Sequence, residues 1–161
     1  MSRINVIKGV IECNEDLTSY FDQIITLPDD IQKKMLQASG EVMAEEERNT
    51  AKSMLSVNSG RYTDVNKGIA KNIKVGKMKK NRGDNWYHTD VIFRGTQHGV
   101  RRAEIAFIQE YGALHMAKGS LNGKAWVQHP RPFIQTAINN ASGEAVAAAE
   151  KIFFDDFIDK Y

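Results

Sequence analysis

The segment Pro130-Arg131-Pro132-Phe133-Ile134-Gln135-Thr136-Ala137 marks the entry into a long C-terminal helix. Proline is tolerated in the first turn of a helix, because the amide hydrogen that it lacks would have no partner there. Beyond Pro132, apolar residues recur every three or four positions, which is the spacing of one helix face. The pattern therefore predicts a helix over 132–160. The predicted apolar face consists of Ile134, Ile138, Ala141, Ala145, Ala148 and Ile152.

A second long helix is predicted over 28–57. Asp29 and Asp30 suit its first turn, where carboxylates meet the positive end of the helix dipole. Apolar residues from Ile31 to Val42 then follow a 4-3-4 spacing on one face. The second half, around Glu45–Glu47, is too polar for a core, so we expect it to project over a sheet edge or to face a partner.

The remaining segments predict a small sheet and its connections. Residues 69–94 alternate in the manner of a β-hairpin with a basic tip. Residues 1–27 predict an N-terminal strand and a short helix, and 112–130 a long loop that contains Gly119, Asn122 and Gly123. Residues 103–110 fit either a third strand or a short helix, and the helix is favoured because Glu104, Ala106 and Gln109 weaken the strand pattern. The predicted fold class is α+β, a small antiparallel sheet with the long N-terminal helix and the C-terminal helix packed on one face.

Length and composition favour one domain over 1–161. The chain has 161 residues, of which 42% are hydrophobic and 26% are charged. No stretch approaches the roughly 20 apolar residues of a membrane span, and we expect neither a membrane contact nor a secretion signal. The single cysteine, Cys13, fits a protein made in the reducing cytosol and is interpreted as a small buried hydrophobe.

No pattern of catalytic or metal-binding residues is present in the sequence. The histidines, at positions 88, 98, 115 and 129, lack the tight ligand pairs of a zinc site. Asp155, Asp156 and Asp159 are interpreted as a solvated helix face rather than an acid–base pair. We therefore expect no catalytic residue, no cofactor and no metal, and we predict that the chain is not an enzyme.

Charge is distributed unevenly along the chain. Arg61–Arg102 holds eleven Lys or Arg and three Asp or Glu, a net charge of +8, whereas the rest holds eleven basic and seventeen acidic residues, a net charge of −6. Such asymmetry indicates either a nucleic-acid contact or a contact between neighbouring subunits. The alternative function is thus a basic nucleic-acid-binding module that uses the 71–87 hairpin, with Trp86 and Tyr87 as candidate stacking residues.

Two short motifs carry a resemblance to a known family. Phe107-Ile108-Gln109-Glu110-Tyr111-Gly112 has an aromatic residue, a glutamate, a second aromatic residue and a glycine, and Arg131-Pro132-Phe133 follows downstream. This order resembles the tail-completion, or head–tail joining, proteins of long-tailed bacteriophages and prophages. The chain departs from the family pattern at Ala113, where threonine is common, and at Pro130, where alanine is common.

The resemblance implies a structural virion protein of the neck, at the position of a tail-completion or tail-terminator subunit. Such a subunit would be made in the cytoplasm of the host bacterium and would form a homo-oligomeric ring, with a hexamer expected. Its partners would be other copies of itself, the connector or stopper protein and the tail-tube protein, and DNA would pass through the lumen without specific binding.

The uneven charge suggests how neighbouring subunits of such a ring could meet. We expect the Lys74–Arg82 hairpin of one subunit to dock on Glu45–Glu47 or on Asp155–Asp159 of the next. The residues expected at subunit or partner contacts are Lys74, Lys77, Lys79, Lys80, Arg82, Glu45, Glu46, Glu47, Tyr111, Arg131 and Phe133.

Overall fold

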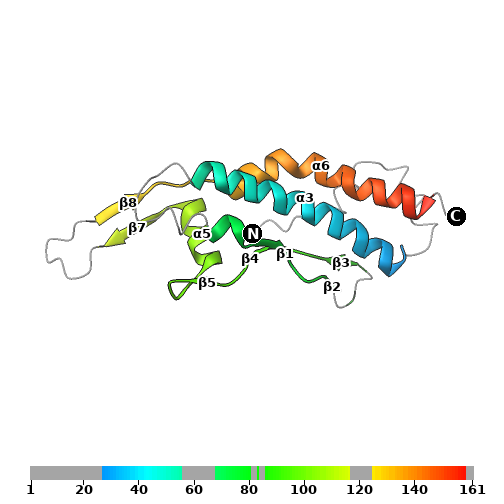
Figure 1. Cartoon of the computed structure of the whole chain (residues 1–161), viewed down its shortest axis with the longest axis horizontal. Coiled ribbons are helices and arrows are strands. Elements are labelled where there is room, and N and C mark those ends of the chain that lie inside the picture. The colour runs from blue at the N-terminus through cyan, green and yellow to red at the C-terminus, as the bar shows by residue number, and fades with distance from the viewer. Residues whose placement is uncertain (1–26, 56–67, 81–82, 84–85, 117–124, 159–161) are drawn as a thin grey trace. The chain divides into compact units, whose positions relative to one another are not determined.

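The helices lie where the sequence predicts them. The computed structural model describes residues 27–55, 68–80, 83, 86–116 and 125–158. Its helices are α3 (Asp29–Leu55), α5 (Arg102–Tyr111) and α6 (Phe133–Asp156) (Figure 1). The helices predicted over 28–57, 103–110 and 132–160 are confirmed in these ranges.

The strands are short and pair two by two. The pairs are β1 (Ile73–Val75) with β4 (Val91–Phe93), β2 (Lys79–Lys80) with β3 (Tyr87–His88), β5 (Thr96–Gln97) with β6 (Val100–Arg101), and β7 (Ala113–Met116) with β8 (Ala125–Gln128). The α+β class is confirmed, with the strands arranged in two-stranded pieces rather than in one sheet. The hairpin predicted over 69–94 corresponds to the β1–β4 and β2–β3 pairs, except that residues 68–71 are helical, so its first three predicted residues are not in a strand.

The described chain divides into two compact units. One unit holds the described residues up to Met43, Val75–Val91 and those from Ala141 onward, and the other holds the described residues of 44–74 and 92–140. The helices α3 and α6 each contribute residues to both units. The single domain predicted over 1–161 stays a prediction.

An apolar cluster between α3 and α6 forms the core of the first unit (Figure 1). Leu27, Ile31 and Met35 pack there with Ala149 and Phe153. Lys34 of α3 also forms an ion pair with Asp156, near the opposite end of α6. Early residues of α3 therefore meet late residues of α6, as expected for helices that run in opposite directions.

The buried face of α6 differs from the predicted one. It is a row at steps of four residues, Phe133, Ala137, Ala141, Ala145, Ala149 and Phe153. Ala141 and Ala145 belong to both rows, but Ile134, Ile138, Ala148 and Ile152 are only half-buried. The prediction also extended the apolar surface to Phe153, which is buried. It placed the isoleucines on the buried face, whereas the middle of the buried row consists of alanines, whose small size favours a short distance between packed helices.

One face of the second half of α3 is buried, which contradicts the expectation that this segment is too polar for a core. Ala44, Glu47, Thr50, Ala51 and Leu55 all lie in the interior of the second unit. The prediction weighed the charged residues of this segment and gave little weight to small and polar residues. Alanine and threonine bury readily when they share one helix face, and Glu47 is buried with them.

The loop predicted over 112–130 instead contains a hairpin. β7 and β8 pair antiparallel, and Leu114 lies opposite Val127 in this register. Four residues per strand are too few for a strong alternating pattern, and the glycines between them favoured the interpretation as a loop. The strand and helix predicted over 1–27, apart from Leu27, lie outside the described residues, as do Arg82 and Asp159.

The core of the first unit can be tested at two adjacent phenylalanines. Phe153 is buried, with 8% of its surface exposed, whereas Phe154 is 54% exposed. We expect Phe153→Ala to lower the free energy of unfolding by about 3 kcal/mol or more, because it leaves a cavity in the apolar cluster. Phe154→Ala should cost less than about 1 kcal/mol. Urea denaturation of both variants measures the difference, and equal losses would contradict the assigned core.

Candidate functional site

The two sequence motifs meet at the N-terminus of α6. The carboxylate of Glu110, the last residue but one of α5, accepts hydrogen bonds from the backbone N–H groups of Ile134 (2.8 Å) and Gln135 (3.0 Å). These N–H groups lie in the first helical turn, where they have no partner within the helix. The carboxylate is negatively charged at the positive end of the dipole, so Glu110 acts as a cap supplied from a distant part of the chain.

A second backbone contact holds the same segments together. The N–H of Arg131 donates to the carbonyl oxygen of Gln109 at 2.7 Å. Gly112 adopts a φ of +75°, and a Cβ atom there would lie 2.5 Å from the carbonyl oxygen of Gln128. Both the left-handed conformation and the close approach therefore require glycine. We call Gln109, Glu110, Gly112, Arg131 and the first turn of α6 the motif clamp.

A buried carboxylate lies beside the motif clamp. Glu47 of α3 is 5% exposed, and its Oε2 atom has no hydrogen-bond partner. Burial, together with the nearby negative charge of Glu110, raises the pKa of Glu47 to about 7. Near neutral pH, Glu47 is therefore protonated in a larger fraction of the molecules than an exposed glutamate is.

The basic hairpin makes its closest contacts with α3 of its own chain. The hydroxyl of Tyr87 donates to the carboxylate of Asp29 at 2.7 Å, and the Lys80 ammonium lies 3.3 Å from the same carboxylate. These contacts, that of Tyr87 first, lower the pKa of Asp29. The ammonium groups of Lys33 and Lys80 lie 4.7 and 5.3 Å from the centre of the Tyr87 ring. Tyr87 and Lys80 thus hold the hairpin against α3.

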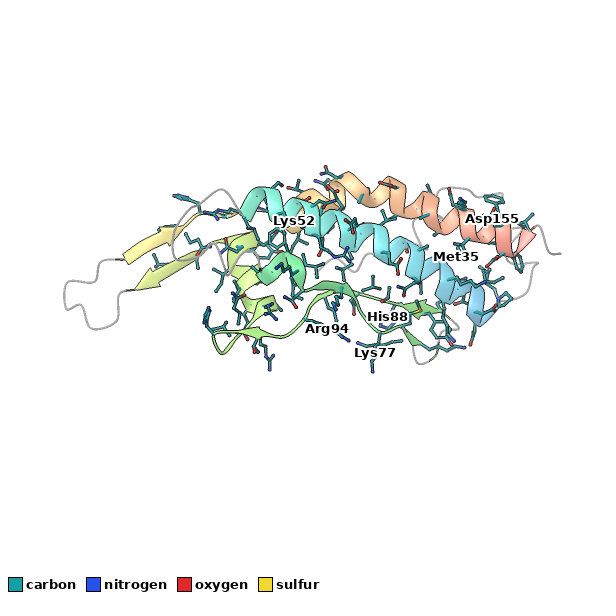
Figure 2. All side chains as sticks on the ribbon, viewed as in Figure 1. Met35, Lys52, Lys77, His88, Arg94 and Asp155 are labelled. Carbon is teal, nitrogen blue, oxygen red and sulfur yellow. The ribbon has the colours of Figure 1, made fainter. Side chains whose placement is uncertain are left out.

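The other predicted lysines of the hairpin are exposed. Lys74, Lys77 and Lys79 all lie on the surface. The side chain of Lys77 extends away from α3 in Figure 2. These residues remain candidates for contact with an acidic partner, whereas Lys80 is engaged within the chain.

The acidic residues predicted as docking partners differ in their surroundings. Glu45 is exposed and forms an ion pair with Arg48 one helical turn away. Glu46 is half-buried, and its Oε1 accepts hydrogen bonds from Thr50 (3.2 Å) and Asn140 (2.9 Å). Glu47 is buried, so it cannot form a surface contact with a lysine of another subunit.

The three predicted contact residues of the two motifs also differ. Tyr111 is exposed and packs on Phe107, with ring centroids 4.7 Å apart. Arg131 is half-buried and takes part in the motif clamp. Phe133 is fully buried and meets Phe93 edge-to-face at 6.1 Å, so it belongs to the core and not to the surface.

A set of exposed apolar side chains lies on α5 and on the β7–β8 hairpin. Phe107, Tyr111, Leu114 and Val127 are each 58–66% exposed. Leu114 and Val127 are directly opposite one another across the two strands. Large apolar side chains in such a group mark surfaces at which other molecules bind. Of these residues, only Tyr111 was predicted at a contact, because Leu114 and Val127 fall in the segment that was interpreted as a loop.

The described part of the chain contains no group of three or more His, Cys, Asp or Glu residues arranged to hold a metal ion. None of its helices is long and apolar enough to cross a membrane. No protein-family model, curated protein or solved structure matches this chain.

The cap on α6 can be tested by removing its carboxylate. Glu110→Ala leaves the N–H groups of Ile134 and Gln135 without their partner, and we expect a loss of about 2 kcal/mol in the free energy of unfolding. Glu104→Ala on the exposed side of α5 is the matched control and should have little effect. Equal stability of the two variants would contradict the capping role.

The buried carboxylate predicts a pH-dependent stability. The pKa of Glu47 is raised in the folded chain, so its contribution is fully present below the ordinary value of 4.5 and is lost as pH rises to about 7. Between pH 4.5 and about 7, the native chain should therefore lose about 3 kcal/mol of its free energy of unfolding relative to Glu47→Gln. Above this window, the difference between the two proteins should stay constant. Glu45→Gln, at an exposed position, should show no such trend in urea denaturation at several pH values.

Proposed function

We propose that this chain is a structural virion protein at the head–tail interface of a long-tailed bacteriophage or prophage, where it acts by assembling into a ring. The proposal rests on the resemblance of Phe107–Gly112 and Arg131–Phe133 to the tail-completion proteins. The observation that supports it best is that these two motifs form one structural unit. Glu110 of the first motif caps the helix that the second motif opens.

The motif clamp gives the two motifs a structural purpose. Glu110 is explained by its role as the cap of α6. Gly112 is explained by its φ of +75° and by its close approach to Gln128. The phenylalanine after the proline is explained by its burial.

The surface features fit a subunit that contacts other proteins. Apolar side chains are exposed on α5, β7 and β8, whereas exposed lysines lie on the β1–β4 and β2–β3 ribbon. A ring needs two different surfaces on each subunit, one for each neighbour. The chain thus carries surfaces of two kinds, one apolar and one basic.

The alternative, a nucleic-acid-binding module, uses the same lysines. Lys74, Lys77 and Lys79 are exposed and available to phosphates. The ring of Tyr87, however, has the ammonium groups of Lys33 and Lys80 close to it and is tied to Asp29 through its hydroxyl. The Tyr87 ring is therefore engaged in contacts within the chain, whereas Trp86, the other candidate stacking residue, is 39% exposed.

Two measurements on the purified full chain separate the functions. We expect negative-stain microscopy to show closed rings, and light scattering to give a mass that is a whole multiple of 18.1 kDa. We expect duplex DNA to bind weakly, with little difference between the native chain and Lys77→Glu/Lys79→Glu. Tight DNA binding that falls steeply with salt and is lost in that variant, without rings, would overturn the proposal in favour of the alternative.

A further inference from the structure

The β7–β8 hairpin has two open edges. β7 and β8 form a two-stranded sheet, so within the described residues neither strand has a second strand beside it. Each open edge presents backbone N–H and C=O groups that can pair with another strand. A two-stranded hairpin without further support is only marginally stable in water, so a covering partner would stabilise it.

The edges lack the features that usually prevent strand pairing between chains. Natural proteins protect exposed edges with lysine, other charged residues or proline. Ala113-Leu114-His115-Met116 and Ala125-Trp126-Val127-Gln128 contain no Asp, Glu, Lys, Arg or proline. Leu114 is 65% exposed and Val127 is 60% exposed, and they face each other across the ladder. The hairpin thus combines open edges with an open apolar pair.

From these observations we infer that the β7–β8 hairpin is a contact surface for a second copy of this chain, with β8 of one copy paired to β7 of the next. This inference rests on the proposed function and assigns one of its subunit contacts. The strands have the same length, and β7 runs antiparallel to β8. If a rotation places a second copy beside the first, β8 of the first copy also runs antiparallel to β7 of the second copy. The same contact can then be repeated from copy to copy.

A second copy fits these edges better than an unrelated partner does. A single strand from another protein would cover one edge and leave the other open, whereas a row of identical hairpins covers both edges of every copy. The absence of charge also matters, because like charges on the two strands would repel identical copies. In a closed ring, the row would have no free end.

The contact is tested with lysines placed on the exposed apolar pair. Leu114→Lys/Val127→Lys adds two charges at positions that are exposed in the single chain, so we expect the rest of the fold to be retained. The two lysines also lie opposite each other within the hairpin, so Leu114→Lys alone, which lacks that repulsion, should cause the same loss of assembly. The added charges repel across each contact, and we expect the particle mass from light scattering to fall to 18.1 kDa. The control, Val100→Lys/Phe154→Lys, adds the same charge at exposed apolar positions outside the hairpin and should assemble normally.

Hydrogen exchange gives a second readout on the native chain. We expect amide protection in β7 and β8 to increase with protein concentration, and to stay low in Leu114→Lys/Val127→Lys. Protection in a monomer that does not depend on concentration would mean that another part of the same chain covers the edges, and it would overturn the inference. A native chain that stays monomeric with unprotected strands would overturn it too.

The outcomes separate this inference from the proposed function. Rings that persist in Leu114→Lys/Val127→Lys would overturn the hairpin contact and leave the ring function standing. Hairpin-dependent assemblies that never close into rings would support the contact and overturn the ring function.

Discussion

The hydrogen bonds that the Glu110 carboxylate accepts from the first turn of α6 are the interaction on which the second unit depends. One carboxylate satisfies two N–H groups at the helix start, at 2.8 and 3.0 Å. The same short segment of chain ends α5 at Gly112 and begins β7. The cap therefore fixes three things together: the end of one helix, the start of another and the base of a hairpin. Glu110 and the first turn of α6 are more than twenty residues apart in the sequence.

Glu47 shows what this arrangement demands of its surroundings. A buried carboxylate that caps a helix creates a negative field, and Glu47 lies within that field without a hydrogen bond to its Oε2 atom. The chain resolves the conflict through protonation, which removes one of the two charges. An apolar residue would pack there without this conflict, so Glu47 is the clearest case in the described chain of a residue that stability alone does not explain.

The sequence was sufficient to predict the long helices, the basic hairpin and the α+β class, because periodicity over many residues averages out local exceptions. The sequence did not predict features that depend on tertiary contacts. The burial of Glu47 and Phe133 depends on which elements pack around them, and four-residue strands such as β7 carry too little pattern to distinguish them from a loop. The importance of Glu110 was visible as part of a motif, but its hydrogen bonds to Ile134 and Gln135 required the fold.

The β7–β8 ladder has a consequence for evolution. The strands bring residues 116 and 125 opposite each other, with eight residues between them in the sequence. Lengthening the connection between two paired strands costs only about 0.6 kcal/mol for each doubling of its length. Related sequences can therefore gain or lose residues here while the spacing within each motif stays fixed. Distant homologues should be recognised by the two short motifs, with a variable gap between them, rather than by overall identity.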